Sequence, residues 1–208
     1  MTVRNHTEFL WHDVFAFNCL NPVDAPAFKD WKLKRTYMSS QRKPLLLAET
    51  ERVKGTMPTV GFYLHERIGP KEEPVFVRGF QATSPDRTDG SWIVTLSEPA
   101  GSYMAATTLD SVFLFDNLDR CCIHSAPSFG DVGPQDASTT VSRFYLARGN
   151  LKAFLNRYQA DRMHLAKRQK WARPTTGKPY GRMEEMLPDE LEAVLEKAER
   201  FRRGHLPA

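Results

Sequence analysis

Short apolar runs, some alternating with polar residues, predict a β-rich region between positions 43 and 98. Runs of this length, bounded by turn residues, are typical of strands that pack on a core. In one of them Phe62 and Leu64 alternate with less apolar neighbours, which predicts a half-buried strand. The strands that we expect here are 45–48, 60–64, 74–80 and 92–96.

A turn sequence lies between the last two of these runs. Pro85 presets one backbone angle, and Gly90 tolerates a positive φ after an aspartate. We therefore expect 84–91 to be a turn and the flanking segments 74–83 and 92–97 to form a hairpin.

Three further segments follow the predicted hairpin. The apolar stretch 112–115 predicts a buried strand. The prolines and glycines of 125–138 predict a loop. Residues 139–146 are rich in β-branched and aromatic side chains, which predicts another strand.

The hydrophobic period changes to that of a helix after residue 149. Asn150 is a favourable N-cap, and the pattern predicts a helix that runs to about Trp171. Its apolar stripe consists of Leu151, Phe154, Leu155, Tyr158, Leu165 and Ala166. A second helix is predicted over 188–204, with acidic residues in its first turn and basic residues in its last, as the helix dipole favours.

These elements predict an α+β fold, with a mostly antiparallel β-sheet in the N-terminal two-thirds followed by two C-terminal helices. We expect residues 1–148 to form a β-rich scaffold domain. Residues 149–208 would then be a basic helical segment packed on the scaffold or appended to it. The sequence does not alternate strands with helices, which argues against a doubly wound nucleotide-binding fold.

The charge of the chain is polarised along its length. Residues 1–142 hold 14 Lys and Arg against 17 Asp and Glu, whereas residues 143–208 hold 15 against 8. The net charge of +4 therefore combines about −3 in the first part with +7 in the last. Three cysteines, no secretory leader and no apolar run of membrane-spanning length predict a cytoplasmic protein that does not enter a membrane.

Between Arg143 and Arg182 eleven basic residues stand against one acid, Asp161. Helices that only need solubility usually mix acids with bases, so a one-sided charge indicates a negatively charged partner. Trp171 and Tyr180 add aromatic rings that can stack on bases. The site residues that we predict in this segment are Lys152, Arg157, Arg162, Lys167, Arg168, Lys170, Trp171, Arg173, Lys178, Tyr180 and Arg182.

A second basic cluster lies near residue 33. If 31–37 is a strand, Lys32 and Lys34 point to one face, while Arg35 joins the aromatic residues of the other. We include Lys32, Lys34 and Arg35 as candidate contacts of the same partner. The alternative is an edge strand that uses lysines against aggregation.

The sequence thus predicts a nucleic-acid-binding protein without catalysis, which contacts the phosphates of DNA or RNA through the basic helix and the loop after it. One alternative is an interaction subunit or inhibitor that docks on an acidic protein or a ribonucleoprotein. Another is a metal-independent nuclease that uses His and Lys. The cations can also serve solubility alone.

No cofactor and no metal are expected. Cys121, Cys122 and His124 are close in sequence, but adjacent cysteines suit one metal poorly, so we interpret them as small core residues. Gly177-Lys178 lacks the first glycine and the following hydroxyl of a phosphate-binding loop. No residue is assigned a catalytic role.

Overall fold

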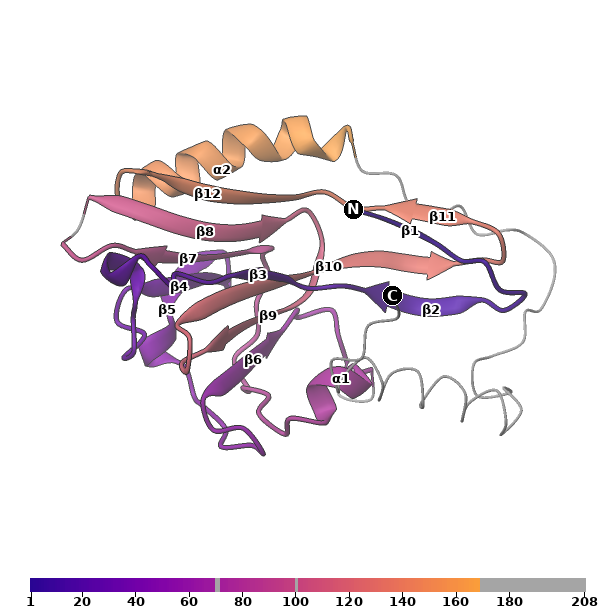
Figure 1. Cartoon of the computed structure of the whole chain (residues 1–208), viewed down its shortest axis with the longest axis horizontal. Coiled ribbons are helices and arrows are strands. Elements are labelled where there is room, and N and C mark those ends of the chain that lie inside the picture. Colours follow the sequence, from indigo (N-terminus) through magenta and orange to yellow (C-terminus); the bar gives the residue numbers. More distant parts are fainter. Residues whose placement is uncertain (70–71, 100, 169–208) are drawn as a thin grey trace.

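Twelve strands and two α-helices make up the part of the chain that the structure, a computed structural model, describes: residues 1–69, 72–99 and 101–168 (Figure 1). One sheet contains β2 (Trp11–Phe15), β3 (Asn18–Leu20), β6 (Val60–Leu64), β9 (Ser111–Asn117) and β10 (Cys122–Val132). A second contains β4 (Thr36–Ser40), β5 (Lys43–Leu46), β7 (Trp92–Leu96), β8 (Ser102–Thr108) and β12 (Ser142–Arg148). We call them the β10 sheet and the β8 sheet.

Smaller elements complete the fold. β1 (Thr2–Arg4) and β11 (Ala137–Thr139) form a two-stranded sheet. The α-helices are α1 (Val75–Arg78) and α2 (Leu151–Ala166), and two short 3-10 helices are η1 (Pro26–Phe28) and η2 (Leu47–Glu49).

All strand ladders of these sheets are antiparallel, and α2 follows the last strand. The α+β fold class predicted from the sequence is therefore confirmed. The second predicted helix, 188–204, lies outside the described residues. No helix within the described ranges is long and apolar enough to cross a membrane.

The central core lies between the β8 and β10 sheets. Side chains from the facing strands of both sheets are almost fully buried there: Met38, Ile93, Met104, Tyr63, Leu114 and Ile123. Each sheet also has an apolar outer face, because neighbouring residues of a strand point to opposite sides. On the β10 sheet this face holds Phe62 and Phe113, and on the β8 sheet it holds Trp92 and Tyr103.

Several predicted strands are present where the hydrophobic pattern placed them. β6 and β7 coincide with 60–64 and 92–96, and 112–115 lies inside β9. The prediction that 60–64 is half-buried is wrong, because the outer face of β6 packs in an aromatic cluster and all five residues are buried. Two other predicted strands are shifted: 45–48 overlaps β5 and η2, and 139–146 overlaps β12.

The predicted strand 74–80, and with it the hairpin to 92–97, is wrong. Residues Val75–Arg78 form the single helical turn α1, with Pro74 at its N-cap. A helical turn brings Val77 and Phe80 to one side, where both pack against the aromatic cluster of the β10 sheet. Burial against that cluster overrides the strand preference of the valines and phenylalanine. β7 pairs instead with β4 and β8.

The loop predicted for 125–138 is also wrong. β10 runs through this segment to Val132, and β11 follows. The pairing register of β10 shifts next to Pro127 and around Gly130, which has a φ of 67°. The residues that indicated a loop therefore mark irregularities within a long strand, a position where proline and glycine are tolerated.

Helix α2 begins where the sequence predicts. The side chain of Asn150 accepts a hydrogen bond of 3.0 Å from the backbone N–H of Ala153, which is N-capping geometry. Phe154, Tyr158 and Leu165 are its buried residues, in agreement with the predicted stripe, although Ala166 is exposed. The helix ends at Ala166 rather than near Trp171, which lies outside the described residues.

Candidate nucleic-acid interface

Helix α2 lies on the outer face of the β8 sheet (Figure 1). Phe154 is fully buried there, with its ring edge-to-face against Trp92 and Tyr103 at centroid distances of 5.5 Å. Tyr145 of β12 also contacts Phe154, at 5.7 Å. One face of α2 is thus held by aromatic packing, and the opposite face is left to solvent.

The five cations predicted on this helix are all exposed: Lys152, Arg157 and Arg162 lie in α2, and Lys167 and Arg168 follow directly after its last residue. We call this set the basic face of α2. At about 1.5 Å of rise per residue, Lys152 and Lys167 are separated by about 22 Å along the helix axis. Arg162 falls at the border of the buried stripe, yet its side chain is also exposed. The basic face therefore extends along the whole helix.

Asp161, the single acid of this segment, is bound by protein partners. Its Oδ2 atom lies 2.6 Å from an Arg143 guanidinium nitrogen and 2.9 Å from Nε of Arg157. The hydroxyl of Tyr145 donates to the same oxygen at 3.1 Å. Burial opposes the charge of this carboxylate, but the donated hydrogen bonds outweigh it and lower the pKa of Asp161. Asp161 therefore neutralises one charge among its two arginines and none elsewhere on the helix.

The remaining cations of the basic face have no acidic partner from the sheets. Six ion pairs occur among the described residues, and none joins a base of 143–168 to a carboxylate of 1–142. Acidic residues of 1–142 form ion pairs with bases of the same region, for example Asp116 with Arg52 and Asp110 with Arg67. Within the described ranges, the basic excess of 143–168 is thus present on the folded surface as well.

The second basic cluster differs from its prediction. Residues 31–37 do not form a continuous strand, because β4 begins only at Thr36 and Leu33 has a positive φ of 54°. Lys32 and Lys34 are exposed. Trp31, which the alternating pattern placed on an inward face, is also exposed.

Arg35 is held by the protein itself. Its guanidinium donates to the backbone carbonyls of Ala27 at 2.9 Å, Leu96 at 2.7 Å and Lys29 at 2.8 Å. It also pairs with Glu98 at 3.3 Å. Since its guanidinium already donates to three carbonyls, Arg35 is not free to contact a partner, unlike Lys32 and Lys34.

Lys34 and the start of α2 lie at the same end of the β8 sheet. Along this end, Leu96 of β7 pairs with Tyr103 of β8, and Ser102 pairs with Arg148 of β12. Three strand spacings separate β4 from β12, roughly 14 Å. Arg148, which is not among the predicted site residues, is exposed and ends β12 at this end of the sheet, two residues before the N-cap of α2. Arg148 is one of the eleven basic residues between Arg143 and Arg182, and it lies directly before Gly149 and the N-cap.

The other predicted contacts fall beyond the described part of the chain: Lys170, Trp171, Arg173, Lys178, Tyr180 and Arg182. Among the described residues, the structure therefore brings together Lys152, Arg157 and Arg162 on α2 and Lys167 and Arg168 directly after it. Chemically, the described surface offers guanidinium and ammonium donors suited to phosphate or carboxylate oxygens.

Comparison with models of known protein families, with curated proteins and with solved structures finds no match to this chain.

Proposed function

We propose that this protein binds nucleic acid through the basic face of α2 and that it contacts mainly phosphates. The observation that supports the proposal is the exposed row of cations whose one acidic partner in the described part of the chain, Asp161, is already bound by Arg143 and Arg157. A polyanion neutralises such a row and releases its own counterions on binding. Arg148, Lys32 and Lys34 extend the surface at the end where α2 begins.

Phosphate contact has a measurable consequence, since each contact releases counterions. Five contacts predict a slope of log affinity against log salt concentration of about −4.5 with duplex DNA and about −3.5 with a single strand. Sequence preference is expected to be weak, because phosphates carry no base identity.

The test uses fluorescence anisotropy of labelled duplex DNA, duplex RNA and single-stranded RNA over a salt series. The variant Lys152→Glu/Lys167→Glu/Arg168→Glu changes three exposed cations of the basic face. We expect it to lose most of its affinity and to reduce the salt slope to that of about two contacts, roughly −1.8 with duplex.

A matched control separates the basic face from the overall charge. Lys43, Lys54 and Arg120 are also exposed but lie away from α2, Lys43 in β5 and the other two between elements. Lys43→Glu/Lys54→Glu/Arg120→Glu changes the net charge by the same amount. This control variant should keep the wild-type affinity and the wild-type slope of log affinity against log salt concentration. Equal losses in the two triple variants would show that only the total charge matters, which would refute the proposed surface.

A second candidate function is docking on an acidic protein or a ribonucleoprotein. It is favoured by large apolar side chains that are exposed on α2 and on β12, the strand before it: Met163 at 77%, Leu146 at 76% and Phe144 at 49%. Phe144 and Leu146 belong to β12, which is an edge strand. Capture of a partner from lysate with and without nuclease treatment distinguishes the two functions. A partner retained after nuclease treatment, combined with no anisotropy response, supports docking and refutes direct nucleic-acid binding.

We place the protein in the cytoplasm. The three cysteines are all free in the structure, which suits a reducing compartment.

A further inference from the structure

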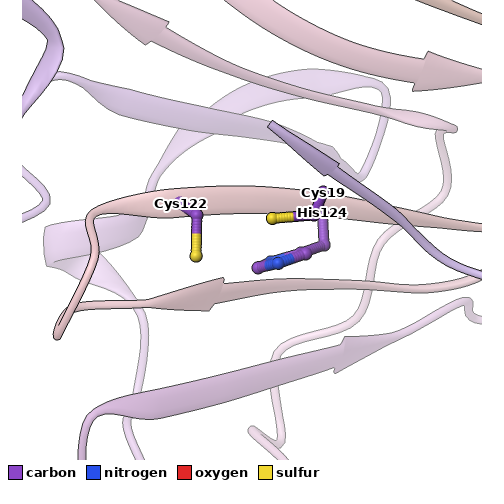
Figure 2. Close-up of side chains that lie close together, drawn as sticks. All are labelled: Cys19, Cys122 and His124. Atoms are coloured by element: carbon purple, nitrogen blue, oxygen red, sulfur yellow. The ribbon is translucent and has the colours of Figure 1, made fainter. Parts of the chain in front are cut away.

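Strand pairing brings three metal-ligating side chains together on the outer face of the β10 sheet. In the register of β3 with β10, Cys19 lies directly opposite His124. Cys122 precedes His124 by two residues on β10 and therefore points to the same face. Figure 2 shows the three side chains close together, with those of Cys122 and His124 extending from the same side of β10. We call Cys19, Cys122 and His124 the thiol–imidazole cluster.

The spacing of these ligand atoms is close to that of a metal centre. The two sulfurs and an imidazole nitrogen lie within 4.8 Å of one another. In a tetrahedral zinc site, bonds of about 2.3 Å to sulfur place two sulfurs about 3.8 Å apart. Small changes of side-chain torsion angles can bring the ligand atoms to zinc-binding distances, because all three residues are on adjacent, hydrogen-bonded strands.

The imidazole ring of His124 is held by two contacts with Phe115. Its Nδ1 lies 3.3 Å from the backbone carbonyl oxygen of Phe115. The ring also stacks on the Phe115 ring, with 3.7 Å between centroids and an interplanar angle of 1°. When Nδ1 carries the proton and donates to that carbonyl, Nε2 keeps the lone pair that binds a metal. Metal-binding histidines in proteins commonly have this second hydrogen bond.

The cluster is both shielded and accessible. Cys122 and His124 are each 4% exposed, whereas Cys19 is exposed. A cation can thus reach the cluster from the side of Cys19 and lose most of its water on binding. Phe17, itself partly exposed, lies 6.0 Å from the His124 ring and borders the cluster.

We propose that Cys19, Cys122 and His124 bind one Zn²⁺ ion per chain, with the fourth coordination position available to water or to another ligand. Two thiolates and one imidazole form a donor set that selects zinc or other thiophilic ions over magnesium and calcium. Three protein ligands with one open position also distinguish this arrangement from closed structural sites.

Protonation of the free cluster is compatible with this role. Burial lowers the pKa of His124 to about 4, so the imidazole is neutral at physiological pH. Burial, together with the nearby Cys19, raises the pKa of the Cys122 thiol to about 12. Zinc would bind the two sulfurs as thiolates and the imidazole as the neutral ring, so any proton held by a thiol passes to solvent as its Zn–S bond forms.

The inference is independent of the proposed nucleic-acid binding. Ile123 points into the central core, so the cluster next to it faces away from the β8 sheet. The basic face of α2 lies on the outer side of that other sheet. Zinc at the cluster would link the three-residue strand β3 to β10.

The experiment uses the full chain, reduced, stripped with chelator and kept free of oxygen. Cobalt(II) serves as the spectroscopic probe, because a thiolate-to-cobalt charge-transfer band reports sulfur ligands. Zn²⁺ is then added to displace the cobalt, and its affinity is measured by competition with a chelating dye. We expect one cobalt per chain with thiolate absorption that is lost on addition of zinc.

Single substitutions test the assignment of each ligand. Cys19→Ser, Cys122→Ser and His124→Phe should each weaken zinc binding roughly tenfold or more. Cys121→Ser is the matched control, because Cys121 is the sequence neighbour of Cys122 but its Sγ donates to the carbonyl of Leu118, away from the cluster. This control should bind zinc as the wild type does.

Two results would overturn the proposal. One is the absence of thiolate absorption in the reduced wild type, and the other is an equal loss of affinity in Cys121→Ser and Cys19→Ser. Circular dichroism of each variant checks folding. The exposed Cys19 is the decisive position, since its substitution by serine removes a ligand without opening a cavity in the core.

Discussion

Asp116 is the most deeply buried carboxylate of the described structure, and Arg52 is its ionic partner. The Arg52 Nη1 nitrogen lies 2.7 Å and 3.0 Å from its two oxygens, and the Tyr63 hydroxyl lies 3.4 Å away. Burial raises the pKa of Asp116 to about 6, although Arg52 acts in the opposite direction. The carboxylate therefore depends on Arg52 for its charge at neutral pH.

Replacing Arg52 tests this dependence. Arg52→Met leaves a buried charge without a partner and should lower the free energy of unfolding at pH 7 by about 3–5 kcal/mol. Burial raises the pKa of Asp116 and Arg52 opposes that rise, so removing Arg52 moves this pKa further up. The unpaired carboxylate then takes up a proton as pH falls, and the stability deficit should be smaller at pH 4.5 than at pH 7. Urea unfolding at both pH values measures it.

The double variant Arg52→Met/Asp116→Leu is the control for the same pair. Removing both charges eliminates the unpaired carboxylate, so most of the lost stability should return. A deficit in Arg52→Met that is independent of pH and persists in the double variant would mean that packing of the Arg52 side chain, rather than its charge, is what matters.

At the scale of elements, α2 is held on the β8 sheet by aromatic packing and by the contacts of Asp161 with β12. Asp161→Asn should lower stability by up to about 1 kcal/mol, since it weakens the contacts from Arg143 and Tyr145 that join the helix to β12. The same change frees Arg143 and Arg157 and removes a negative charge, so nucleic-acid affinity should rise. Thermal unfolding and anisotropy measure the two effects on the same preparation.

The pH dependence of this contact has a defined sign. The pKa of Asp161 is lowered in the folded state, so its contribution is present above the unfolded value near 3.9 and is lost as pH falls below it. The difference in stability between wild type and Asp161→Asn should therefore disappear in acid. If Asp161→Asn instead binds nucleic acid more weakly, the arginines act through their ion pair and not as free cations.

Helices and strands were predicted correctly where they depend on residues close together in the sequence. The N-cap at Asn150 and the strands 60–64 and 92–96 depend on residues a few positions apart, and all three are present. The strand predicted for 74–80 and the loop predicted for 125–138 were wrong because their conformation depends on distant partners. Val77 packs against Phe62, and β10 is stabilised on both edges by β2, β3 and β9.

At the scale of the whole molecule, the two proposed sites lie on opposite outer faces of a two-sheet core. The basic face is on the β8 sheet and the thiol–imidazole cluster on the β10 sheet. We expect zinc removal by chelator to leave nucleic-acid affinity and its salt slope unchanged. Anisotropy with zinc-loaded and stripped protein measures this. A change of affinity on stripping would mean that the two faces are coupled through the core.

The sequence by itself determined the fold class, the start of α2 and the one-sided charge of residues 143–168, because periodicity, capping and net charge arise from neighbouring residues. Tertiary structure alone decided which residues meet. It directed the guanidinium of Arg35 to backbone carbonyls, and it placed Cys19 rather than Cys121 beside Cys122 and His124. Such contacts depend on strand order and register, which are set by burial of the whole sheet. Patterns among neighbouring residues of the sequence therefore do not predict them.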